Sequence, residues 1–103
     1  QGQRKGMKLP SSKTKVELAK TPAWRHLGKS IARSFVFDDF SQAMKFVNHV
    51  SRLAEAVNHH PDITIQYNKV KLTLTTHDEG GLTMKDFRLA RKIDQLERKP
   101  SRF

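Results

Sequence analysis

Three histidines stand at the boundaries of predicted structural elements, where their side chains could meet. His59 and His60 follow a long helical pattern and precede Pro61, and His77 follows a run of strand-like residues. Histidine gives or accepts a proton near neutral pH, so a group of imidazoles can supply both a general acid and a general base. These residues therefore form a candidate active site for chemistry that moves protons.

The residues alone leave three interpretations of this cluster open. Three histidines can bind zinc, but adjacent side chains such as those of His59 and His60 diverge along a helix or a strand and would have difficulty reaching one ion. The histidines could be structural, because a histidine near a helix C-terminus is favoured as a cation. They could instead perform acid–base catalysis without a metal, such as a dehydration, with Glu55 and Asp86 orienting the imidazoles.

A long amphipathic helix is predicted immediately before the two adjacent histidines. Asp39 and Gln42 have the spacing of a capping box at its start. Apolar residues then recur at every third or fourth position as far as Val57. Pro61 disfavours helical backbone at the residue before it, so we expect the helix to end near Asn58.

A β-hairpin is predicted over residues 63–76. Its apolar residues occupy odd positions before Asn68-Lys69 and even positions after it, and this change of phase is typical of a two-residue loop. Continued outward, the same register would place His60 directly opposite His77, with about 5 Å between the Cβ atoms. The loop position therefore determines whether these two imidazoles face each other.

Three further elements complete the expected fold. They are a short helix over residues 11–20 with capping-box spacing at Thr14 and Glu17, a hairpin over 24–37 that turns at Gly28-Lys29, and a last helix capped by Thr83 with Asp86 at the capping-box position. The resulting order predicts an α+β fold, a four-stranded antiparallel sheet with three helices packed on one face.

Length and composition indicate a single small domain. The 103 residues divide into a disordered basic tail (1–10), one domain (11–98) and a second basic tail (99–103). No apolar run approaches the length of a membrane span, and we expect no membrane partner. The chain has no cysteine, which fits a reducing compartment. We expect a cytoplasmic location, with an organelle as the alternative.

The net charge of +10 is concentrated towards the two ends of the chain. Residues 1–33 carry nine basic side chains and one acidic one, whereas residues 34–88 carry six basic and seven acidic side chains. No RNP, zinc-finger or helix-turn-helix pattern accompanies the charge. A nucleic-acid partner is therefore not expected.

Taken together, the candidate residues resemble the motif of the pterin-4a-carbinolamine dehydratase family. The matching positions are Glu55-x3-His59-His60-Pro61-x5-Tyr67-x9-His77-x8-Asp86, with Trp24, Ile31-x-Arg33-x-Phe35-x-Phe37 and Asp39-Phe40 upstream. The resemblance covers roughly residues 24–96. It favours the catalytic interpretation of the three histidines.

The resemblance implies a lyase that removes water from 4a-hydroxytetrahydropterin and yields the quinonoid dihydropterin, without a metal or another cofactor. It implies catalytic roles for His59, His60 and His77, without assigning acid or base. The supporting or substrate-binding residues it implies are Glu55, Pro61, Asp62, Thr76 and Asp86.

The same resemblance implies partners. The pterin is the substrate, the chain forms a homo-oligomer (a dimer or a tetramer), and the reaction serves tetrahydropterin recycling for an aromatic amino acid hydroxylase. The alternative is a non-enzymatic binding module of the same fold, acting as a transcriptional coactivator or an assembly factor.

Overall fold

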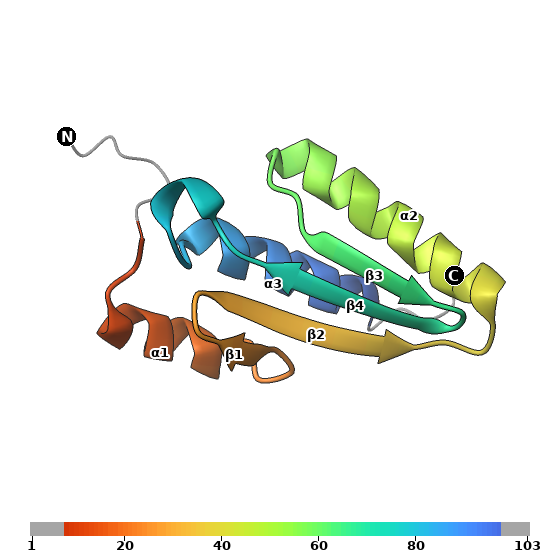
Figure 1. Ribbon diagram of the computed structural model, residues 1–103, viewed down its shortest axis with the longest axis horizontal. Coiled ribbons are helices and arrows are strands. Elements are labelled where there is room, and N and C mark those ends of the chain that lie inside the picture. Colours follow the sequence, from red (N-terminus) through yellow and green to blue (C-terminus); the bar gives the residue numbers. More distant parts are fainter. Residues whose placement is uncertain (1–7, 98–103) are drawn as a thin grey trace.

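The computed structural model describes residues 8–97, and its elements follow the predicted order (Figure 1). Their bounds are α1 Ser11–Ala19, β1 Arg25–Leu27, β2 Ser30–Val36, α2 Phe40–Val57, β3 Asp62–Gln66, β4 Lys69–Leu74, the 3-10 turn η1 His77–Glu79, and α3 Met84–Glu97. The four strands form one antiparallel sheet in the order β1-β2-β4-β3. The α+β prediction, with four antiparallel strands and three helices, is confirmed.

The helices pack on one face of the sheet because the strands alternate between apolar and polar residues. Phe35 of β2 and Leu72 of β4 are buried beneath the helices, whereas Ser34 and Lys71, which point to the opposite face, are exposed. Figure 1 shows α2 and α3 lying along the same side of the strands. The alternation follows directly from the two-residue period of a β-strand.

Helix α2 contributes a continuous apolar stripe to the core. Its start is capped as predicted, since Oδ1 of Asp39 accepts a hydrogen bond from the backbone N–H of Gln42 at 2.9 Å. The ring of Phe46 lies 4.6 Å from that of Phe35 and 5.0 Å from that of Phe37, measured between centroids. Burying one such side chain stabilises a fold by roughly 1.5–3 kcal/mol, so this aromatic cluster holds α2 to the sheet.

The start of α1 differs from the prediction. The helix begins at Ser11, directly after Pro10, and Thr14 lies in its second turn, where its hydroxyl donates to the carbonyl of Pro10 at 3.1 Å. Glu17 is buried and accepts a hydrogen bond from Arg91 of α3 at 3.3 Å. The capping box predicted at Thr14 and Glu17 is therefore wrong, because Glu17 joins α1 to α3 instead.

The predicted tails lie largely outside the described residues, namely 1–7 and 98–103. Residues 8–10, which the sequence assigned to the first tail, are part of the packed structure. The N–H of Leu9 donates to the carbonyl of Leu82 at 2.9 Å, and the Leu9 side chain packs against the core.

The loop between β3 and β4 lies one residue earlier than predicted. It consists of Tyr67 and Asn68, with Tyr67 in the left-handed region (φ 54°), instead of Asn68-Lys69. Asn68 is fixed to the segment after β2, because its Nδ2 donates to the carbonyl of Phe37 and its own carbonyl accepts from the N–H of Phe37, both at 2.8 Å. The resulting register pairs Ile65 with Val70, two residues away from the predicted pairing.

Candidate active site

The C-terminal end of α2 sets the directions of the two adjacent histidines. Asn58 adopts the left-handed conformation (φ 54°, ψ 45°) that commonly ends helices and that asparagine tolerates. The N–H of His59 then donates to the carbonyl of Ala54 at 3.1 Å, which closes the last turn. Pro61 follows, where extended chain replaces the helix. His59 therefore stays beside the helix end, while His60 leads into β3.

A buried hydrogen-bond network joins His59 to the start of α3. Nε2 of His59 lies 2.6 Å from Oδ1 of Asp86, whose side chain is fully buried. The other carboxylate oxygen, Oδ2, accepts from the hydroxyl of Thr76 and from the backbone N–H of Thr83, both at 2.9 Å. Asp86 thus has the predicted capping-box role and also holds an imidazole.

This arrangement fixes which nitrogen of His59 can react. An ionised carboxylate only accepts hydrogen bonds, so Nε2 of His59 carries the proton that Asp86 binds. The Nδ1 atom is then left to accept a proton from a ligand. A carboxylate placed behind an imidazole in this way also stabilises the imidazolium that forms after proton transfer. The side chain of His59 is only 11% exposed, so its orientation is held from several sides.

His60 is paired with a carboxylate that is more exposed than Asp86. Nε2 of His60 lies 2.7 Å from Oε2 of Glu55, but the two side chains are 54% and 75% exposed. Exposed pairs of this kind contribute little to stability, about 0–1 kcal/mol. Glu55 therefore orients His60 without fixing it, and both groups remain open to a ligand.

His77 lies on η1 and not at the end of a strand. Strand β4 ends at Leu74, and the β3–β4 ladder ends at Asp62 paired with Thr73. The prediction that His60 lies directly opposite His77 is therefore wrong. The cause is the loop at Tyr67-Asn68, which moves the whole register by two residues.

His77 is nevertheless connected to the His59 network through its neighbour. Thr76 is buried and donates its hydroxyl to Asp86, which in turn binds His59. His77 follows Thr76 directly and is exposed. The structure therefore joins His59 and the segment that carries His77 through one carboxylate.

The remaining predicted residues, Pro61 and Asp62, follow His60 directly in the chain. Pro61 is half-buried between α2 and β3, and Asp62 is exposed at the first position of β3. One residue missing from the predicted site is Thr83, whose hydroxyl lies 2.8 Å from that of Thr76. In the sequence, Thr83 stands three residues before Asp86, and this spacing was interpreted only as a helix cap.

Metal ligands and membrane-spanning helices are two further features that residues 8–97 could carry. Within that range, no group of three or more histidine, aspartate or glutamate side chains is arranged to hold a metal ion. No helix among these residues combines the length and the apolar composition of a membrane span.

Comparison with known proteins identifies the family. The model of the pterin 4 alpha carbinolamine dehydratase family matches residues 7–96, which is most of the chain. The chain belongs to the pterin-4a-carbinolamine dehydratase family. The match includes every residue of the candidate active site.

Relatives in this family are similar over nearly their whole length. A protein of Thermomicrobium roseum, provisionally named pterin-4-alpha-carbinolamine dehydratase, is 52% identical over 79 residues, which are 77% of this chain and 85% of the relative. A protein of Sulfurisphaera tokodaii with the same provisional name is 47% identical over 89 residues, which are 86% of this chain and 96% of the relative.

Two solved structures show the same fold. A Brucella melitensis protein described as a transcriptional coactivator/pterin dehydratase is 37% identical, with a TM-score of 0.81 over 85% of this chain and 96% of its own. A pterin dehydratase-like protein described as a RuBisCO assembly factor of the alpha-carboxysome is 26% identical, with a TM-score of 0.62 over 72% of this chain and 88% of its own. The structural neighbours of this chain thus include proteins described by roles other than dehydration.

Proposed function

We propose that this protein is a dehydratase that converts 4a-hydroxytetrahydropterin to the quinonoid dihydropterin. The reaction breaks the bond between C4a and the hydroxyl, removes the proton on N5, and releases water. It needs one group that protonates the leaving hydroxyl and one that accepts the N5 proton. The observation that carries the proposal is the His59–Asp86 pair, at 2.6 Å with the carboxylate fully buried.

In this mechanism His59 is the general base. Its Nδ1 accepts the N5 proton, while the carboxylate of Asp86 holds Nε2 and stabilises the imidazolium that forms. His77 is the general acid for the departing hydroxyl, because it is exposed and follows Thr76, which is bonded to the same carboxylate. After one turnover the base holds a proton and the acid lacks one, and exchange with solvent restores both.

The other predicted residues bind the pterin or support the residues that do. His60 and Glu55 form an exposed, hydrogen-bonded pair beside the end of α2, where they can contact polar edges of the ring. Asp62 adds an exposed carboxylate at the start of β3, and Pro61 sets the direction of the chain between them. Thr76 contributes through its bond to Asp86 and is a positioning residue.

The test is a dehydration assay with chemically generated carbinolamine, followed by ultraviolet absorbance. The protein should accelerate the loss of the carbinolamine above the uncatalysed rate, with saturation at high substrate concentration. Folded protein that leaves the rate unchanged would contradict the proposal. That result would favour the second candidate, a binding module acting as coactivator or assembly factor, for which the descriptions of the two solved relatives are the support.

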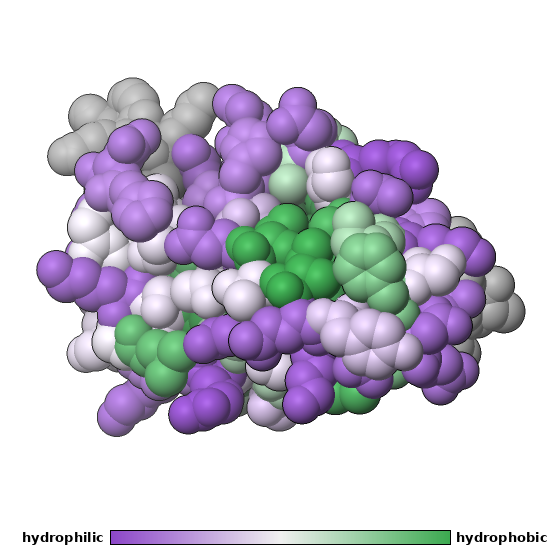
Figure 2. All heavy atoms as spheres, turned by 45° about the vertical axis from the view of Figure 1, so that its right-hand side comes forward, coloured by the Kyte–Doolittle hydropathy of each residue, from purple (hydrophilic) through white to green (hydrophobic). Residues whose placement is uncertain are grey.

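We also propose that the protein acts as a homo-oligomer assembled through the edge of its sheet at β3. This strand has a neighbour on one side only, in the order β1-β2-β4-β3. Ile63 and Ile65 of β3 are 37% and 36% exposed, and Phe40 and Val57 of α2 are also exposed. Figure 2 shows apolar atoms gathered on one face of the molecule, surrounded by polar ones. An uncovered apolar edge strand readily pairs with another chain.

Light scattering with size-exclusion chromatography tests the assembly. The native protein should be a dimer or a tetramer, and Ile65→Lys should shift it to the monomer. Val36→Lys is the control, because Val36 is 69% exposed on β2, away from the edge at β3. A native monomer, or an Ile65→Lys oligomer identical to the native one, would contradict this proposal.

A further inference from the structure

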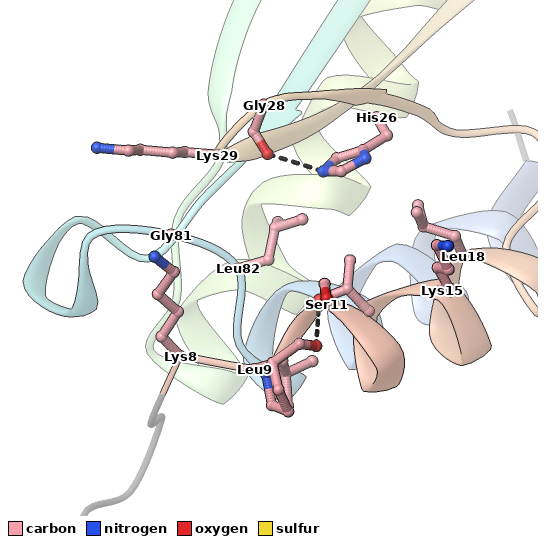
Figure 3. A pocket seen from close by; sticks show the side chains of 12 residues that line it. Lys8, Leu9, Ser11, Lys15, Leu18, His26, Gly28, Lys29, Gly81 and Leu82 are labelled. Carbon is pink, nitrogen blue, oxygen red and sulfur yellow. Dashed lines mark hydrogen bonds between the residues drawn. The ribbon is translucent and has the colours of Figure 1, made fainter.

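A second concave site lies away from the histidines, between α1 and the β1–β2 turn. The cavity has a volume of about 480 Å³, which falls within the range of small-molecule sites. Figure 3 shows the β1–β2 turn with His26, Gly28 and Lys29 on one side of it, and the segment from Lys8 into α1 on the other. None of the three candidate catalytic histidines lines it, and neither does Asp86 or Glu55, the carboxylates that bind His59 and His60.

The lining combines an apolar floor with a cationic rim. Leu9, Leu18 and Leu82 supply apolar surface, and Leu82 belongs to the buried core. The lysines are Lys8, Lys15 and Lys29, which come from three different segments and are all exposed. Neither aspartate nor glutamate occurs among the lining residues.

These positive charges are not neutralised by the described part of the chain. Among the ion pairs formed within residues 8–97, none involves Lys8, Lys15 or Lys29. The N-terminus of α1, at Ser11, adds to the positive potential because Pro10 provides no side-chain cap and the first turn holds no acidic residue. A ligand that enters the cavity therefore meets cations at the rim and leucines at the floor.

We propose that this cavity binds a small amphipathic anion, a molecule with an apolar body and one anionic head group. The apolar body lies against the leucine floor, where its burial supplies most of the affinity. The head group, a carboxylate or a phosphate, lies among the lysines, whose ammonium groups act as point charges towards either. The site is distinct from that of the proposed dehydratase, so it does not depend on that function.

Calorimetry and amide chemical shifts of the whole chain test this proposal with defined probes. Octanoate and octyl phosphate are the two test ligands, and they distinguish the carboxylate from the phosphate head group. Octylammonium has the same alkyl chain with the opposite charge, and inorganic phosphate has the charge without the chain. One octanoate or octyl phosphate should bind per chain and shift the amides of Leu9, Leu18 and Gly28, whereas octylammonium and inorganic phosphate should bind at least tenfold more weakly.

Two lysine variants on the same helix provide a matched comparison. Lys15→Gln removes a charge from the rim and should weaken binding about threefold, which is the usual size of one exposed charge contact. Lys13→Gln removes an exposed charge from α1 outside the cavity and should leave binding unchanged. Equal affinity for octylammonium or for inorganic phosphate, equal effects of the two variants, or binding without saturation would each overturn the proposal.

Discussion

Replacing Asp86 with asparagine keeps the shape of the buried network and changes its chemistry. Asparagine offers one oxygen and one NH₂ group where aspartate offers two oxygens. The oxygen must remain with the N–H of Thr83 and the hydroxyl of Thr76, which both donate to Oδ2. The NH₂ group then faces Nε2 of His59 in place of Oδ1. Because an NH₂ group only donates, His59 must move its proton to Nδ1 and can no longer act as the base.

The expected effects on turnover and on stability differ in size. Partners that orient a metal-bound histidine typically contribute 10–100-fold, and a forced change of tautomer in a comparable carboxylate–histidine pair costs about 10⁴-fold. We therefore expect turnover to fall by about 10²–10⁴-fold. Stability should fall by only about 1–2 kcal/mol, because charge-assisted hydrogen bonds are replaced by neutral ones.

Steady-state dehydration and urea unfolding of the same preparations measure both quantities. Asp39→Ala is the matched control, since it removes a comparable helix cap, the 2.9 Å bond to the N–H of Gln42, at the opposite end of α2. It should cost about 1 kcal/mol of stability and leave turnover unchanged. An Asp86→Asn variant with near-native turnover would refute the assigned role of His59.

Four further outcomes follow from the structure. His60→Ala should raise KM more than it lowers kcat in steady-state assays, and an unchanged KM would contradict its binding role. Phe46→Ala should lower the free energy of unfolding by about 3–5 kcal/mol in urea, because this ring is fully buried between α2 and the sheet; a loss below 1 kcal/mol would argue against that packing. Glu17→Gln should destabilise the fold by about 1–3 kcal/mol, since the carboxylate is buried against Arg91, and unchanged unfolding would show that this contact is not made in solution. Dialysis against EDTA should leave turnover intact, and a loss that zinc restores would support a metal site instead.

The sequence predicted the helices and strands in their correct order, but it did not predict the register of the β3–β4 pair. Shifting the β3–β4 register by two residues leaves each side chain on its original face, so the alternation around Ile65 and Val70 is identical for the predicted and observed pairings. The choice between them comes from Asn68, which bonds to the backbone of Phe37, 31 residues earlier. A local pattern of apolar residues cannot predict a contact between residues so far apart in the chain.

In the candidate site, too, local rules predicted the positions of the residues along the chain but not the distances between them. Local rules placed His59 at a helix end and Asp86 at a helix start, and they identified the two carboxylates that bind the adjacent histidines. The distance between those helix ends depends on how α2 and α3 cross the sheet, which periodicity does not specify. Likewise, the burial of Glu17 against Arg91 joins segments 74 residues apart, so a capping-box spacing was the only interpretation that the neighbouring residues suggested.

The most direct test of the central claim is the rate at which the native protein and a His59→Ala variant remove chemically generated carbinolamine. We expect saturable acceleration by the native protein and a loss of at least 10²-fold in turnover for the variant, with circular dichroism showing that both are folded. Native protein without acceleration, or a folded His59→Ala variant as active as the native protein, would contradict the central claim.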